Sequence, residues 1–272
     1  MKMKLSYPVC AVQTEQDIMA WCEDPEEGIR YLGKNGYEGI ELLVRDSEKV
    51  EKEKIQEILH VYHMQISAIG TTPMQKEDHL FLLSEEKEIR DEAKRRLEGL
   101  ISLGEYFKAP VLIGKYRGTV KDTSGCRMED LESVIREADE TAGRKGVQLL
   151  VEPQTPSNIN NLNTIEETVA WIHTNQFSNV KLLMDIFHMD KTEESVTETL
   201  KTFRNYIGMI HMADSGRKVP GFGETGMKKI LETLEEIGYQ GYLSMEIRQN
   251  PDTRFAAALS SLSLQYMCGG KE

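Results

Sequence analysis

Four residues in the second half of the chain combine the types and the spacing that a metal site requires. Each closes a short apolar run, and they lie 33, 26 and 35 residues apart: Glu152, Asp185, His211 and Glu246. Three carboxylates and an imidazole brought to one point would repel each other and lose hydration, unless a divalent cation balanced them. Such a donor set suits Mn²⁺, Mg²⁺ or Co²⁺ better than a thiolate zinc site. One acid alone is more often a helix cap or a solvated loop residue, so only the set of four predicts a metal site.

Two further polar residues lie beside this set. His188 follows Asp185 by three positions, and Arg217 lies in a glycine-rich loop between Asp214 and Gly223. Arg217 could grip a substrate hydroxyl or carboxylate, or only pair with a surface acid, and we favour the substrate role. His188 could be a structural histidine with satisfied hydrogen bonds or a residue of the site.

These residues can meet only if strands bring their carboxyl ends together, and the sequence has a repeating pattern typical of such strands. Eight short apolar runs alternate with longer charged segments; the runs cover residues 9–12, 39–44, 66–70, 110–114, 147–151, 180–184, 207–212 and 242–247. Such runs are typical of buried strands in a parallel sheet. The segments between them carry apolar residues at helical spacing, as at Leu97, Leu100 and Ile101. A capping-box pattern from Thr164 to Glu167 marks one expected helix start.

The alternation predicts an α/β fold, a (β/α)₈ TIM barrel that fills residues 1–272 as one domain. The chemistry of such barrels lies at the carboxyl ends of the strands. Strands five to eight are neighbours in a closed barrel, so the four metal-ligand candidates can converge there. An open doubly wound sheet is the alternative. No G-x-G-x-x-G pattern follows the first apolar run, so the sequence does not support the dinucleotide-binding form of that sheet.

Composition excludes several classes of protein. The 272 residues carry 33 Lys and Arg against 45 Asp and Glu, and this net charge of −12 opposes binding to nucleic acid. Four cysteines without metal-ligand spacing favour a reduced, cytoplasmic setting over a disulfide scaffold. We find no apolar run of signal-peptide length at the N-terminus and none long enough to span a membrane, so we expect no membrane partner.

The motifs around these residues resemble those of the sugar phosphate isomerase/epimerase family, which has a xylose-isomerase-like TIM barrel. Within it, the ketose 3-epimerases and hydroxypyruvate isomerase are most similar. The resemblance rests on five segments in a fixed order: Leu150–Pro153, Met184–Met189, Ile210–Ser215, Arg217–Gly223 and Ile237–Glu246.

This resemblance implies roles for the candidate residues. Glu152, Asp185, His211 and Glu246 would bind one divalent ion, most simply Mn²⁺, and the two glutamates would also be the acid/base pair. His188 and Arg217 would contact substrate oxygens, and the chain would form a homodimer or homotetramer. Many ketose 3-epimerases have a glutamate that helps hold the sugar where this chain has Asn158, at the end of the stretch from Gln154. That departure argues against a standard ketohexose as the substrate.

The predicted chemistry is proton transfer next to a ketone through an enediolate, on a free ketose or keto-polyol, since no phosphate loop is visible. Transfer between opposite faces of one carbon gives epimerisation, which we favour because the two glutamates come from strands three apart in the ring. A hydroxypyruvate-type isomerase and an inosose isomerase or dehydratase are alternatives. An endonuclease IV-like nuclease of apurinic sites and a non-catalytic sugar-binding barrel are distant ones.

Overall fold

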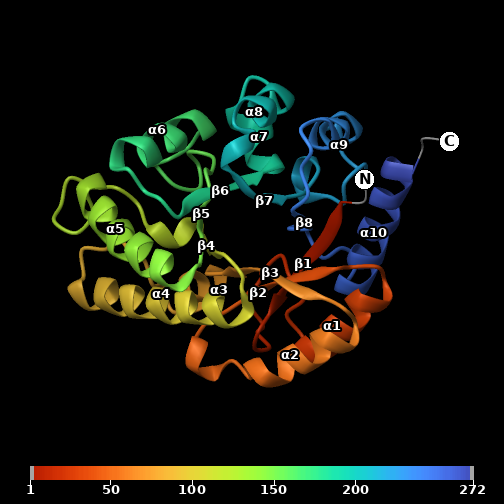
Figure 1. Ribbon diagram of the computed structural model, residues 1–272, viewed down its shortest axis with the longest axis horizontal. Helices are drawn as coiled ribbons and strands as arrows, with labels where there is room; N and C mark the ends of the chain where they lie inside the picture. Colours follow the sequence, from red (N-terminus) through yellow and green to blue (C-terminus); the bar gives the residue numbers. More distant parts are fainter. Residues whose placement is uncertain (1–2, 270–272) are drawn as a thin grey trace.

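Eight parallel strands close into a barrel, and the helices surround it on the outside (Figure 1). The computed structural model describes residues 3–269. The strands are β1 (Lys4–Cys10), β2 (Gly39–Leu43), β3 (Gln65–Gly70), β4 (Val111–Ile113), β5 (Leu149–Val151), β6 (Val180–Asp185), β7 (Ile207–His211) and β8 (Tyr242–Ser244). Each strand pairs with the next in sequence, and β8 pairs with β1, where Ser244 lies opposite Ser6. The predicted (β/α)₈ barrel is therefore confirmed.

Each strand is followed by helical chain that returns to the start of the next strand. The helices are α1 (Pro25–Lys34), α2 (Lys52–Val61), α3 (Thr72–Glu77), α4 (Lys87–Phe107), α5 (Met128–Lys145), α6 (Ile165–Asn175), α7 (Ile186–Thr192), α8 (Val196–Thr202), α9 (Met227–Glu236) and α10 (Thr253–Gly269). Two helices follow β3 and two follow β6, where the sequence predicted one. Short 3₁₀ turns lie at Ser47–Lys49, Lys115–Arg117, Arg204–Tyr206 and Ser215–Arg217. Within residues 3–269, no helix has the length and apolar character needed to cross a membrane.

Apolar clusters outside and inside the barrel hold this architecture together. The large one lies between the barrel and its helices, and it buries the predicted helix faces, including Leu97, Leu100 and Ile101. The small one takes one buried residue from each of β3 to β7: Ala68, Leu112, Leu150, Leu183 and Met209. Leu112 and Leu183 also line a cavity at the carboxyl ends of the strands. The small cluster therefore fills the barrel interior and provides the floor of that cavity.

Strand limits differ from the predictions at both ends of the chain. The first strand begins at Lys4, well before the predicted start, because buried Ser6 and Tyr7 interrupt the apolar run without interrupting the sheet. The last strand ends at Ser244 and not at Ile247. Beyond Ser244 the backbone turns locally, since the Glu246 amide donates to the Ser244 carbonyl at 3.1 Å. The predicted capping box of α6 is present, with the Glu167 amide donating to the Thr164 hydroxyl at 3.1 Å.

Candidate active site

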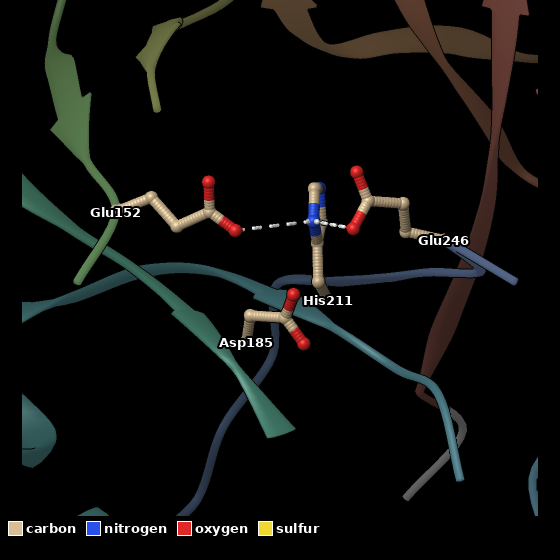
Figure 2. A group of neighbouring side chains, drawn as sticks. All are labelled: Glu152, Asp185, His211 and Glu246. Atoms are coloured by element: carbon tan, nitrogen blue, oxygen red, sulfur yellow. Dashed lines mark ion pairs between the residues drawn. The ribbon is translucent and has the colours of Figure 1, made fainter. Parts of the chain in front are cut away.

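The four metal-ligand candidates meet above the barrel at the carboxyl ends of β5 to β8 (Figure 2). Asp185 and His211 are the last residues of β6 and β7 and are paired in register. Glu152 directly follows β5, and Glu246 lies two residues beyond β8. One possible ligand atom from each residue lies within 4.8 Å of the others. The structure thus brings the four predicted residues together at one point.

Glu152 and Glu246 approach His211 from opposite sides, with Asp185 below them in the view of Figure 2. His211 Nδ1 lies 4.0 Å from Glu152 Oε1 and 3.5 Å from Glu246 Oε2. The Asp185 side chain has two functions. Its Oδ1 accepts the Phe187 amide at 2.9 Å and caps α7, while its Oδ2 faces the other site residues. Asp185 therefore caps a helix with one oxygen and faces the other ligand candidates with the second.

The chemistry of these donors fits a divalent cation. His211 Nδ1 is buried and has no hydrogen-bond partner, although two carboxylates face it. The Nε2 atom on the other side of the ring lies 2.8 Å from Glu41 Oε2, a carboxylate of β2. An imidazole that donates from Nε2 has its lone pair on Nδ1, where a metal ligand is needed. The four residues can therefore hold a metal ion.

The Arg217 side chain lies among the carboxylates of the site. Its Nη1 lies 2.7 Å from Asp185 Oδ2 and 2.8 Å from Glu246 Oε2, and its guanidinium packs 4.2 Å from the centre of the Phe187 ring. The backbone of Arg217 has a left-handed φ of 59°, which directs the side chain inward from the loop after β7. Arg217 is buried and pairs with two of the ligand candidates, so the interpretation as the partner of a surface acid is wrong.

His188 lies in α7 on the same side of the site. Its Nδ1 accepts the Thr155 amide at 3.3 Å, and its Nε2 lies 3.2 Å from Arg217 Nη2 and 3.7 Å from Asp185 Oδ2. The ring is buried, and it lines the cavity above the small apolar cluster. His188 thus has a structural hydrogen bond at one nitrogen and faces the site with the other.

Three residues that the sequence analysis did not single out support Glu152. Gln154 donates its amide to Glu152 Oε2. Arg117, which is only 1% exposed, donates to the backbone carbonyls of Glu152 and Gly114, both at 2.9 Å. Gly114 leaves room for the Glu152 carboxylate, since a Cβ there would lie 2.6 Å from Oε2. The loop after β4 therefore helps to place a carboxylate of β5.

The two glutamates have unequal electrostatic surroundings. Burial raises the pKa of Glu152, and the charges of Glu246 and Asp185 raise it further. Burial also acts to raise the pKa of Glu246, but the charges of Arg217 and His211 outweigh it and hold that pKa below its ordinary value. Arg217 pairs directly with Asp185 and Glu246 but not with Glu152, so the carboxylate excess near Glu152 favours an added cation.

The site opens into two adjoining cavities. The inner one, about 140 Å³, is lined by Glu152, His188, His211, Arg217 and Glu246. The outer one, about 630 Å³, shares Arg217 and Glu246 and extends to Ile18 and Met19 after β1 and to Arg248 and Gln249 after β8. Asn158 lines both cavities. A ligand that reaches the four ligand candidates can therefore extend well beyond them.

Comparison with known proteins identifies the family to which this barrel belongs. Residues 29–264 match the family described as Xylose isomerase-like TIM barrel. The chain belongs to this family. The resemblance to ketose 3-epimerases and hydroxypyruvate isomerase is also confirmed, since the relatives include proteins with these names.

Individual members of the xylose isomerase-like family match to different extents. The chain is 34% identical to D-psicose 3-epimerase of Ruminiclostridium cellulolyticum over 46% of its own length, and it spans less than half, 42%, of that relative. It is 25% identical to 3-dehydro-D-guloside 4-epimerase of Escherichia coli over 89% of this chain and 94% of that protein. The solved structure of 3-keto-D-glucoside 4-epimerase from E. coli has the same fold, with a TM-score of 0.79 at 19% identity over 98% of this chain and 100% of that chain. These relatives support an enzyme of the sugar isomerase/epimerase class.

Gly114→Ala should slow turnover while leaving the fold stable. The added Cβ would lie 2.6 Å from Glu152 Oε2 and 3.2 Å from Gln154 Nε2, which are ends of flexible side chains that can move away. Misplacing a catalytic group by about 1 Å can cost about 10²-fold in rate. We expect a kcat loss of that order with a melting temperature close to wild type. Gly226→Ala is the matched control, because a Cβ there meets nothing within 4 Å; equal kcat in the two variants would contradict the role of Gly114.

Arg217→Ala and His188→Ala should keep the metal ion and lose turnover on the order of 10²-fold, as expected when a preorganised donor to the substrate is removed. Elemental analysis and steady-state kinetics measure the two effects. Arg136→Ala is the control for the arginine, since Arg136 also packs on a phenylalanine ring, that of Phe177, away from the site. Loss of the ion from His188→Ala would instead make this histidine a metal ligand, as in a zinc cluster.

Proposed function

We propose that this chain is a metal-dependent sugar epimerase that acts on a ketose or keto-polyol through an enediolate, with inversion at carbon 3 as the first expectation. The observation that carries the proposal is the placement of Glu152 and Glu246 on opposite sides of His211, in the lining of one cavity. Two carboxylates that face each other across a substrate can exchange protons with opposite faces of one carbon.

Each group in the site has its own role in the proposed reaction. When bound, a divalent ion supplies positive charge that stabilises the negative charge developing on the substrate oxygens, and Mn²⁺ is the first choice. One glutamate accepts the proton from the carbon beside the ketone, so the C–H electrons form the new C=C bond and the carbonyl electrons move to oxygen. The other glutamate, which is protonated at the start of the cycle, then donates its proton to the opposite face, and the electrons flow back to restore the ketone. His188 and Arg217 hold substrate oxygens during this transfer.

A second candidate is an epimerase of larger keto-sugars, such as glycosides that carry a ketone in the ring. The outer cavity of about 630 Å³ lies in the range of about 300–1,000 Å³ that holds drug-sized ligands and exceeds what a six-carbon sugar requires. Asn158 at this cavity cannot act as a carboxylate clamp. One relative that aligns with 89% of the chain is named for a keto-glycoside substrate, which supports this candidate.

A nuclease of apurinic sites has weaker support. Among residues 3–269, the only group of three or more possible metal ligands is the one at Glu152, Asp185, His211 and Glu246, whereas a zinc-cluster nuclease needs additional ligands. The net charge of −12 also opposes a DNA substrate. We therefore expect a small-molecule substrate and no nucleic-acid partner.

Two further properties belong to this proposal, the cellular setting and the oligomeric state. All four cysteines are free thiols, which fits a reduced, cytoplasmic setting. A homodimer or homotetramer is expected from the family resemblance, and light scattering of the purified chain would measure it.

Deuterium exchange tests the proposed function. The metal-loaded chain is incubated in D₂O with ketoses, keto-glycosides, hydroxypyruvate and inososes, and NMR follows each compound after the ion is chelated. We expect deuterium at the carbon beside the ketone together with the epimer. An aldose product would indicate an isomerase, and loss of water a dehydratase. Binding without exchange in any compound, with metal content verified, would instead support a sugar-binding barrel.

A further inference from the structure

A fifth buried carboxylate, Glu41 of β2, lies beside the candidate metal site and lines both cavities. Its side chain is almost completely inaccessible, and the residue is only 3% exposed. Its Oε2 lies 2.8 Å from His211 Nε2 and accepts the Ser244 hydroxyl at 2.9 Å. A buried carboxylate is costly unless such hydrogen bonds satisfy it. Glu41 is therefore held by His211 at the end of β7 and by Ser244 at the end of β8, two residues before Glu246.

The contact to His211 determines which face of the imidazole is free for coordination. A neutral imidazole carries one proton, and a carboxylate beside Nε2 stabilises the form that donates from that atom. The lone pair then lies on Nδ1, the atom that Glu152 and Glu246 face and that has no hydrogen-bond partner. Rotation of the ring would break the Glu41 contact, so the same hydrogen bond also fixes the ring orientation.

We propose that Glu41 is a positioning residue, which holds the His211 ring and its proton so that Nδ1 is presented to a divalent ion, while Ser244 holds Glu41. The inference rests on the proposed metal site and adds to it a residue outside the ligand set. Carboxylate partners of metal-binding histidines act in this way, and their removal typically weakens metal affinity by 10–100-fold.

The test measures metal binding itself. Full-length wild type, Glu41→Gln and Glu41→Leu are stripped with a chelator, and free Mn²⁺ is followed by electron paramagnetic resonance during titration. We expect the Mn²⁺ dissociation constant to rise by about 10–100-fold, with Glu41→Leu affected more because it cannot accept a hydrogen bond. Ser244→Ala should show a smaller effect in the same direction, since Glu41 keeps its contact to His211.

A matched control separates positioning from general damage to the fold. Asp139 is also a buried carboxylate, but it accepts the backbone amides of Ser178 at 3.1 Å and Asn179 at 2.7 Å, away from the site. Asp139→Asn should lower the melting temperature and leave the Mn²⁺ dissociation constant unchanged. A similar loss of affinity in Asp139→Asn would mean that the Glu41 variants act through stability alone, which overturns the proposal.

A second readout reports the His211 ring directly. In histidine-labelled protein loaded with Mg²⁺, NMR should detect an imidazole that is protonated at Nε2 and slow to exchange, and this signal should disappear in Glu41→Leu. Folded Glu41 variants that bind Mn²⁺ like the wild type, or a loss confined to the sugar KM, would overturn the positioning role. A wild type that binds no Mn²⁺ would instead remove the metal site and with it the proposed function.

Discussion

Glu152→Gln and Glu246→Gln should each lower turnover by about 10²–10⁴-fold, the range that general acid/base catalysis contributes. Glutamine keeps an oxygen that can still face a metal ion, but it cannot accept a proton at neutral pH. Steady-state kinetics at saturating Mn²⁺, with metal content measured for each variant, separate the proton-transfer role from the ligand role. Glu92→Gln is the control, since Glu92 pairs with Arg95 and Arg96 on the surface.

The two glutamate variants should also differ from each other in an informative way. Because both residues act on one enediolate, the losses should not add in the double variant. In an epimerase, one variant can still exchange the substrate hydrogen with solvent from one face, while neither completes the inversion. Deuterium wash-in, followed in both reaction directions, reports this asymmetry. Near wild-type turnover of either variant, with its ion in place, would leave that glutamate only a ligand.

Removing His211 or the ion itself should abolish turnover. Wild type should carry about one divalent ion per chain, and His211→Ala should carry almost none at micromolar metal, because the site loses its one nitrogen ligand. An ion at about 100 times its dissociation constant stabilises the folded chain by about 2.7 kcal/mol, so added Mn²⁺ should raise the melting temperature of stripped wild type by several degrees. His211→Ala should lack this shift.

The controls for the metal prediction lie within the same chain. His173 is an exposed histidine that contacts Tyr206, and His173→Ala should keep both the ion and the thermal shift. Elemental analysis and thermal unfolding measure the two quantities. Unchanged metal content in His211→Ala, or three zinc ions per wild-type chain, would contradict a single ion held by Glu152, Asp185, His211 and Glu246.

The sequence determined the barrel and the location of the four ligand candidates. Apolar runs without alternation are typical of strands buried on both faces, and eight of them separated by helical patterns leave few alternatives to a closed parallel barrel. Parallel strands place all their carboxyl ends on one side, so Glu152, Asp185 and His211 had to converge once the strands were recognised. Glu246 was also found in this way, although β8 ends at Ser244 and a local turn brings the carboxylate into place.

The surroundings of these residues were decided by the tertiary structure alone. Glu41 stands within an apolar run, and nothing local shows that it points into the barrel toward His211, 170 residues away in sequence. A buried charge in a predicted strand was the available signal, but its partner depends on how the ring of strands closes. Arg117 is similar, because its hydrogen bonds to Gly114 and Glu152 depend on the packing of one loop against the next strand.

The position of the Arg217 side chain is the clearest example of a feature that the sequence does not predict. Its glycine-rich loop indicated a residue near the site, but a sequence does not specify the backbone φ of 59° that turns the side chain inward. Only the folded loop places the guanidinium between Asp185 and Glu246. Patterns of apolar and polar residues encode which elements form, because whether a residue is buried depends largely on its own polarity. Contacts between side chains of different loops depend on strand register and loop conformation, and these are set by the whole barrel at once.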